Sequence, residues 1–147
     1  MTTDRRPWTC ERIAELIPDY LTGLMEQRFE PYPGDDPGAV MCKWTTSNDE
    51  TSVVVGVTPE AVGESGVVEV REGRRYDDGL EPFFLVVDTE RLRTAGAAAV
   101  SRDDSDPVAT PWGLASVIVN TPFTRFNVST IGLDWAIEIG TRLAEND

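Results

Sequence analysis

The sequence predicts an α+β fold in which an antiparallel β-sheet packs against an N-terminal and a C-terminal helix. Apolar residues recur at helical spacing near both ends of the chain, and between these segments the hydrophobic period changes to two. The chain has 147 residues, 40% of them hydrophobic, and shows no internal repeat. We therefore expect one domain over residues 1–147, with residues 1–8 forming a flexible N-terminal segment.

The first predicted helix starts after Thr9, a residue suited to accept a hydrogen bond at a helix N-terminus. Pro18 interrupts the segment because it lacks an amide donor and crowds the carbonyl of Ala14. We expect two short helices or one kinked helix, with Pro18 opening the second part. Residues 29–38 contain three prolines and two glycines, which predicts a loop. The apolar stripe of this helix consists of Ile13, Leu16, Ile17, Tyr20, Leu21 and Leu24.

Strands are predicted after this loop, where Val40, Cys42 and Trp44 lie on one face and the residues between them lie on the other. The polar turn at Ser47–Glu50 and the valine-rich Thr51–Val57 indicate a hairpin. The alanine-rich stretch 92–100 is too short to assign. Further strands are predicted at Val67–Arg71, Phe83–Asp88, Gly113–Asn120 and Arg125–Ile131, and a C-terminal helix is predicted from the stripe Leu133, Ala136, Ile137, Gly140, Leu143 and Ala144.

The composition excludes several function classes. The chain carries 26 acidic and 13 basic side chains, has no histidine and has a net charge of -13. Binding of nucleic acid needs clustered Lys and Arg, so we expect no direct nucleic-acid binding. Catalytic triads and metal centres that depend on imidazole are also excluded. Phosphate-binding glycine loops are absent from the sequence, as is any apolar run long enough for a transmembrane segment, and we expect no cofactor.

The two cysteines, Cys10 and Cys42, are the right number for one disulfide, which would stabilise the fold by roughly 3 to 4 kcal/mol. Such a bond favours an oxidising compartment. The start of the chain, MTTDRRPWT, contains no apolar leader, so either a leader was removed or the protein stays inside with free thiols. A reactive thiol is the second interpretation, since Cys10 opens a predicted helix and Lys43 adjoins Cys42.

Acidic residues form two loop clusters that could bind calcium. An EF-hand loop read from Asp104 would need glycine and glutamate where Ala109 and Ser116 stand, so the pattern fails. We predict exposed turns and no metal site. The clusters consist of Asp77 and Asp78 and of Asp103, Asp104 and Asp106.

Aromatic residues near loops either cap the core or line a ligand groove. Trp8, Trp112, Phe123 and Trp135 have such positions. The candidate ligand-contacting aromatics are Trp44, Trp112 and Trp135.

Six segments in order, CERIAEL, CKWTT, GAAAVSRDD, WGLASVIV, RFNVST and GTRLAEND, resemble a family of small exported lipoprotein domains of unknown function from actinobacteria. The resemblance covers nearly the whole chain. It implies an α+β sandwich, a Cys10–Cys42 disulfide with Trp44 packed beside it, a lipid anchor at the membrane and no catalytic residue. The chain departs from the family in showing neither a signal peptide nor a lipobox.

The sequence thus favours a non-catalytic binding or accessory domain, extracytoplasmic or at the cell surface if a leader was removed and cytoplasmic otherwise. Its ligand would be a protein or a small molecule. The alternative is an intracellular acidic inhibitor or immunity-type protein that covers a basic partner surface, because a dense negative charge attracts basic partners. An enzyme that relies on carboxylates alone ranks last. Oligomeric state is left open by the sequence.

Overall fold

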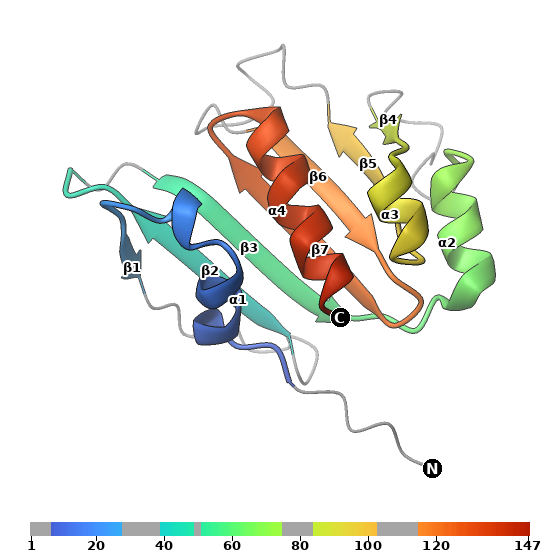
Figure 1. Ribbon diagram of the computed structural model, residues 1–147, viewed down its shortest axis with the longest axis horizontal. Coiled ribbons are helices and arrows are strands. Elements are labelled where there is room, and N and C mark those ends of the chain that lie inside the picture. The colour runs from blue at the N-terminus through green and yellow to red at the C-terminus, as the bar shows by residue number, and fades with distance from the viewer. Residues whose placement is uncertain (1–6, 28–38, 49–50, 75–83, 103–114) are drawn as a thin grey trace.

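The computed structural model describes residues 7–27, 39–48, 51–74, 84–102 and 115–147. The described elements run from the N-terminal helix to the C-terminal helix (Figure 1). They are α1 (Cys10–Leu16), the 3₁₀ helix η1 (Pro18–Tyr20), β1 (Met25–Gln27), β2 (Val40–Thr45), β3 (Thr51–Pro59), α2 (Gly63–Arg71), β4 (Phe84–Val87), α3 (Glu90–Thr94), β5 (Ala98–Arg102), β6 (Ala115–Asn120), β7 (Thr124–Thr130) and α4 (Leu133–Glu145).

Within this part of the chain, seven strands form one sheet in the order β1-β2-β3-β7-β6-β5-β4. Every neighbouring pair is antiparallel. The predicted α+β class, with helices at both ends of the chain packed on an antiparallel sheet, is confirmed.

The two faces of the sheet are covered differently. On the first face, α1, α3 and α4 bury one continuous core, and α4 lies across β6 and β7 (Figure 1). On the second face, Val67 and Val70 of α2 pack against Ala98 and Val100 of β5 in a separate, smaller cluster. The strand side chains of the larger core include Val53, Val55, Val57, Val117, Val119, Phe126 and Val128.

The start of the described chain follows the predicted pattern. The Thr9 hydroxyl accepts a hydrogen bond from the Arg12 amide at 3.0 Å, which caps α1. The helix ends at Leu16, and Pro18 opens η1, as predicted. Trp8 differs from the expectation of a flexible segment over residues 1–8, because its ring is buried and meets Phe126 edge-on at 5.2 Å between ring centroids. Residues 1–6 lie outside the described residues.

The predicted strand at Val67–Arg71 is wrong, because these residues form the second half of α2. A strand would place Val68 and Val70 on the same face, yet Val70 is fully buried and Val68 is 39% exposed. The buried pair is Val67 and Val70, whose spacing of three fits a helix. Packing against β5 therefore outweighs the β-propensity of the valines.

The unassigned stretch 92–100 is divided between two elements. It contains the end of α3 and the start of β5, separated by Gly96 with a φ of +71°. The Ala97 amide donates to the Leu92 carbonyl at 2.8 Å across this turn. A left-handed residue at this position ends the helix and is best supplied by glycine.

The remaining predicted elements are confirmed where the structure describes them. The β2–β3 hairpin, β4, β6, β7 and α4 occupy the predicted segments, with ends shifted by a few residues at most. The predicted loop 29–38 and the acidic residues Asp77, Asp78, Asp103, Asp104 and Asp106 lie outside the described residues.

Candidate functional site

The two cysteines are joined in a disulfide that links α1 to β2. The two Cα atoms are 5.7 Å apart, and neither described cysteine is free. Cys42 is fully buried, whereas Cys10 is partly exposed at the start of α1. The predicted Cys10–Cys42 bond is confirmed.

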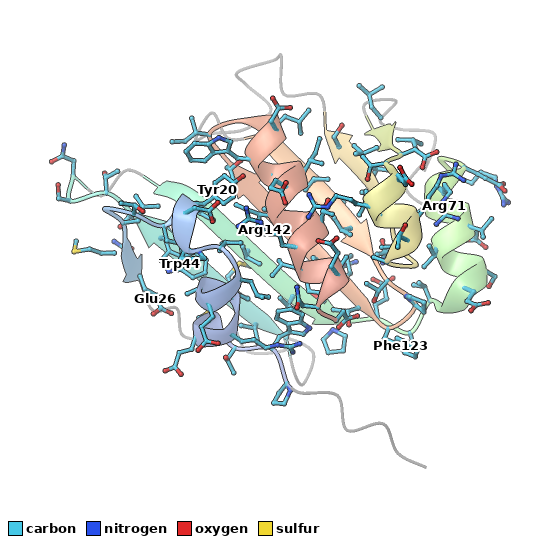
Figure 2. The ribbon with its side chains drawn as sticks, in the orientation of Figure 1. Tyr20, Glu26, Trp44, Arg71, Phe123 and Arg142 are labelled. Atoms are coloured by element: carbon cyan, nitrogen blue, oxygen red, sulfur yellow. A yellow bond between two sulfur atoms is a disulfide. The ribbon has the colours of Figure 1, made fainter. Side chains whose placement is uncertain are left out.

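The candidate aromatics have different surroundings. Trp44 lies on the same strand face as Cys42, is 3% exposed and belongs to the core beneath the helices (Figure 2). Burial leaves Trp44 no surface on which a ligand could stack without opening the core. Trp112 lies outside the described residues. Of these three candidates, Trp135 is exposed in the described part of the chain, and Phe123, the other loop-side aromatic named above, is also 50% exposed, at the turn between β6 and β7.

Trp135 projects from the first turn of α4 with 45% of its surface exposed. Its ring meets Tyr20 of η1 at 5.0 Å between centroids, with 63° between the ring planes. This edge-on contact is a favoured geometry for two aromatic rings. Tyr20 and Trp135, here called the aromatic edge, therefore connect η1 to the start of α4.

Arg142, in the last turn of α4, contacts Tyr20 of the aromatic edge (Figure 2). Its guanidinium carbon is 5.2 Å from the centroid of the Tyr20 ring. The same guanidinium donates to both carboxylate oxygens of Asp19, at 2.7 and 3.0 Å, and to the Leu16 carbonyl at 3.2 Å. The two-pronged pair with Arg142 lowers the pKa of Asp19 from its usual value.

The ionic contacts continue from Arg142 to α3. Glu138 accepts from Arg142 at 3.2 Å and from Arg91 at 2.8 Å, and Arg91 also donates to Glu145 at 2.7 Å. Hydrogen bonds from Arg91 and Arg142 lower the pKa of Glu138. Five side chains of alternating charge thus link η1 and α3 to the exposed side of α4. These ion pairs restrict the backbone on which Tyr20 and Trp135 lie. The five are Asp19, Arg142, Glu138, Arg91 and Glu145.

The aromatic edge can bind a partner through its rings. A half-exposed indole presents a large, stiff apolar surface with few rotamers to lose on binding. In the described ranges, no three metal-ligating side chains come together. The rings of this site can therefore contact an apolar or aromatic group of a partner.

Sequence reasoning named Trp135 as a candidate contact residue but did not name the residues that pack against it and beside it. The sequence placed Tyr20 only in the apolar stripe of the first helix. Asp19 and Arg142 belong to no recognisable motif. They meet because η1 and α4, more than 100 residues apart in sequence, pack side by side. The break at Pro18 was the one local signal that the chain turns here.

A second described surface lies on the sheet face that α2 leaves uncovered. Met41, Gly56 and Asn127 stand in register on β2, β3 and β7. Met41 covers Gly56, because a Cβ built on this glycine would lie 3.6 Å from the Met41 methyl carbon. The same registers place the charged residues Lys43 and Arg125 on this face of the sheet.

Comparisons with known proteins assign this chain to no family. No family model, no curated protein and no solved structure matches this chain. None of the helices in the described ranges has the length and apolar character needed to cross a membrane.

Proposed function

We propose that this chain is a non-catalytic binding domain that acts outside the cytoplasm and uses the aromatic edge to contact its partner. The observation that carries the proposal is the half-exposed indole of Trp135, which Tyr20 holds in place. Exposed aromatic side chains fixed by their neighbours are typical centres of binding energy in interfaces. The partner offers an apolar or aromatic group to this edge.

The compartment is inferred from the disulfide. Cys10 and Cys42 are oxidised, and such bonds persist in extracellular and other oxidising compartments. The resemblance to exported actinobacterial lipoprotein domains supports the same compartment. Both arguments favour the extracytoplasmic domain over the intracellular acidic inhibitor, for which free thiols are expected.

Site-specific crosslinking tests the binding surface. A photoreactive benzoylphenylalanine replaces Trp135 in the protein expressed in its native host, and Glu64, an exposed residue of α2, is replaced in the matched control. We expect one discrete crosslinked product from position 135 and none from position 64, because only the aromatic edge contacts the partner. Equal products at both positions, or none at position 135, would contradict the proposed surface.

Thiol labelling tests the compartment. Protein taken from its native host under acid quench is alkylated without reductant, and its intact mass is measured. We expect no added alkyl group, because both cysteines are bonded. Two alkyl groups would place the protein in a reducing compartment and favour the inhibitor hypothesis. The protein would then be expected to capture basic proteins, and this binding should weaken strongly as the salt concentration rises.

A further inference from the structure

The exposed indole of Trp135 lies in an acidic part of the helical layer. The aromatic edge belongs to η1 and α4, and α1 precedes them on the same face of the sheet. Together these three helices carry six acidic and two basic side chains. The acids are Glu11, Glu15, Asp19, Asp134, Glu138 and Glu145, and the bases are Arg12 and Arg142. A partner that approaches the aromatic edge therefore meets a negative potential, which attracts basic groups.

Asp134 is the acid beside the indole, and the chain does not neutralise it. It is exposed in the first turn of α4, next to Trp135, and no described residue forms a hydrogen bond or an ion pair with it. Glu138 follows Asp134 by four residues and Trp135 by three, so the three side chains share one side of the helix. Glu138 is paired with Arg142 and Arg91. The carboxylate of Asp134 is therefore available to a cation of a partner.

An acid in the first turn of a helix also has a structural explanation, because it interacts favourably with the helix dipole. Glu64 is such an acid in the first turn of α2, a helix without an aromatic residue. Asp134 differs from Glu64 in its neighbour, an indole that is 45% exposed and packed against Tyr20. The face of an indole attracts guanidinium and ammonium groups more strongly than the other aromatic rings do. The carboxylate and the ring face thus favour the same kind of group.

The chain pairs two of its other rings with its own guanidiniums. The guanidinium carbon of Arg12 is 3.7 Å from the centroid of the Trp8 ring, and that of Arg142 is 5.2 Å from the centroid of the Tyr20 ring. Within the described part of the chain, no arginine or lysine stacks on Trp135. The exposed surface of this indole is therefore open to a cation from another molecule.

Building on the proposed function, we propose that the partner is a protein that places an arginine on the indole of Trp135 and pairs its guanidinium with Asp134. Arginine fits this site better than lysine, because a planar guanidinium stacks on a ring and donates to a carboxylate at the same time. The methylene stem of the arginine supplies the apolar contact. The net charge of -13 attracts such a basic partner from a distance.

A titration with an arginine peptide tests the proposal. The intact, oxidised protein is labelled with fluorotryptophan, and Trp135→Phe assigns the fluorine resonance of Trp135. The probe is acetyl-Arg-Gly-Arg amide at low ionic strength, and the control peptide carries citrulline, an uncharged side chain of nearly the same shape, in place of each arginine. We expect the resonance of Trp135 to shift with the arginine peptide and to stay in place with the citrulline peptide, because the contact needs the positive charge.

Two acids in equivalent helical positions provide matched variants. Asp134→Asn should weaken binding of the arginine peptide by about two- to fivefold, as expected for the loss of one exposed ion pair. Glu64→Gln, which removes the same charge from the exposed first turn of α2, should leave the binding unchanged. Equal shifts with the arginine and citrulline peptides, or equal weakening by the two variants, overturn the proposal.

Crosslinking from position 135 separates the proposed partner chemistry from the proposed function. A discrete crosslinked product, combined with no response to the arginine peptide, overturns the arginine contact and leaves the binding surface in place. The absence of that product overturns the surface, and the arginine contact with it. Where the peptide binds and the product forms, its yield should fall as the salt concentration rises, because salt screens the attraction between the arginine and Asp134. A yield that does not change with salt counts against the arginine.

Discussion

At the scale of single residues, the contact between α4 and the sheet depends on Gly140. A Cβ built at this position would lie 2.7 Å from Cγ2 of Val119 and 3.5 Å from Cγ1 of Val117. Both valines belong to the core, so they have little room to move. A glycine inside a helix usually costs stability, and here it allows the helix to approach the strands closely.

Gly140→Ala should therefore lower the free energy of unfolding by roughly 1 kcal/mol, because overpacking of about 1–3 kcal/mol exceeds the gain in helix propensity of about 1 kcal/mol. Urea unfolding followed by circular dichroism measures this loss. Gly132→Ala is the control for a Cβ added without a clash, because a Cβ there has no neighbour within 4 Å, and as Gly132 caps α4 we expect a loss of only a few tenths of a kcal/mol, about the cost of a weaker cap. An unchanged or increased stability of Gly140→Ala would show that Val119 can rotate away.

At the scale of elements, charged pairs decide how η1 and α3 sit on α4. Arg142 joins Asp19 to Glu138, and Arg91 joins Glu138 to Glu145. Surface ion pairs usually contribute little, but a network with two-pronged arginines fixes geometry. The pKa shifts agree with this arrangement. The pKa values of the carboxyls Asp19 and Glu138 are lowered, and the pKa values of the guanidiniums of Arg91 and Arg142 are raised.

These shifts predict how stability depends on pH. A carboxyl whose pKa is lower in the folded state binds a proton more readily when unfolded, so it stabilises the fold above its unfolded pKa of about 4. This contribution to stability should be lost as the pH falls through the lowered folded-state pKa values of Asp19 and Glu138. Urea unfolding between about pH 5 and about pH 2 should show this loss in the wild type.

Arg142→Gln should flatten this part of the pH profile, because it removes a partner of both carboxylates. Arg74→Gln is the control, since the described partner of Arg74 is Glu72, at an exposed position after α2 and away from Asp19 and Glu138. If Arg142→Gln keeps the full loss on acidification, the pairing with Asp19 and Glu138 does not account for it.

At the scale of the whole molecule, the N-terminal segment is attached to both the sheet and the C-terminal helix. The disulfide joins α1 to β2. Trp8 Nε1 donates to the Asp147 carboxylate at 3.0 Å, and Thr124 donates to the same group at 3.1 Å. Arg12 stacks over the Trp8 ring at 3.7 Å from its centroid. These contacts fix the position of the N-terminal segment, which includes Tyr20, on the sheet and on the end of the chain. The strand β4 lies at the opposite end of the sheet from β1.

Local patterns in the sequence determined the fold class, the N-terminal cap, the break at Pro18, the central hairpin and the amphipathic α4, because these features depend on neighbours within a few residues. The two cysteines narrowed the disulfide to one possible pair. Tertiary structure alone decided that Val67 and Val70 lie in a helix, that Trp44 is buried while Trp135 is exposed, and that Asp19 meets Arg142. Each of these outcomes depends on contacts between segments distant in sequence, whose packing energy exceeds local preference.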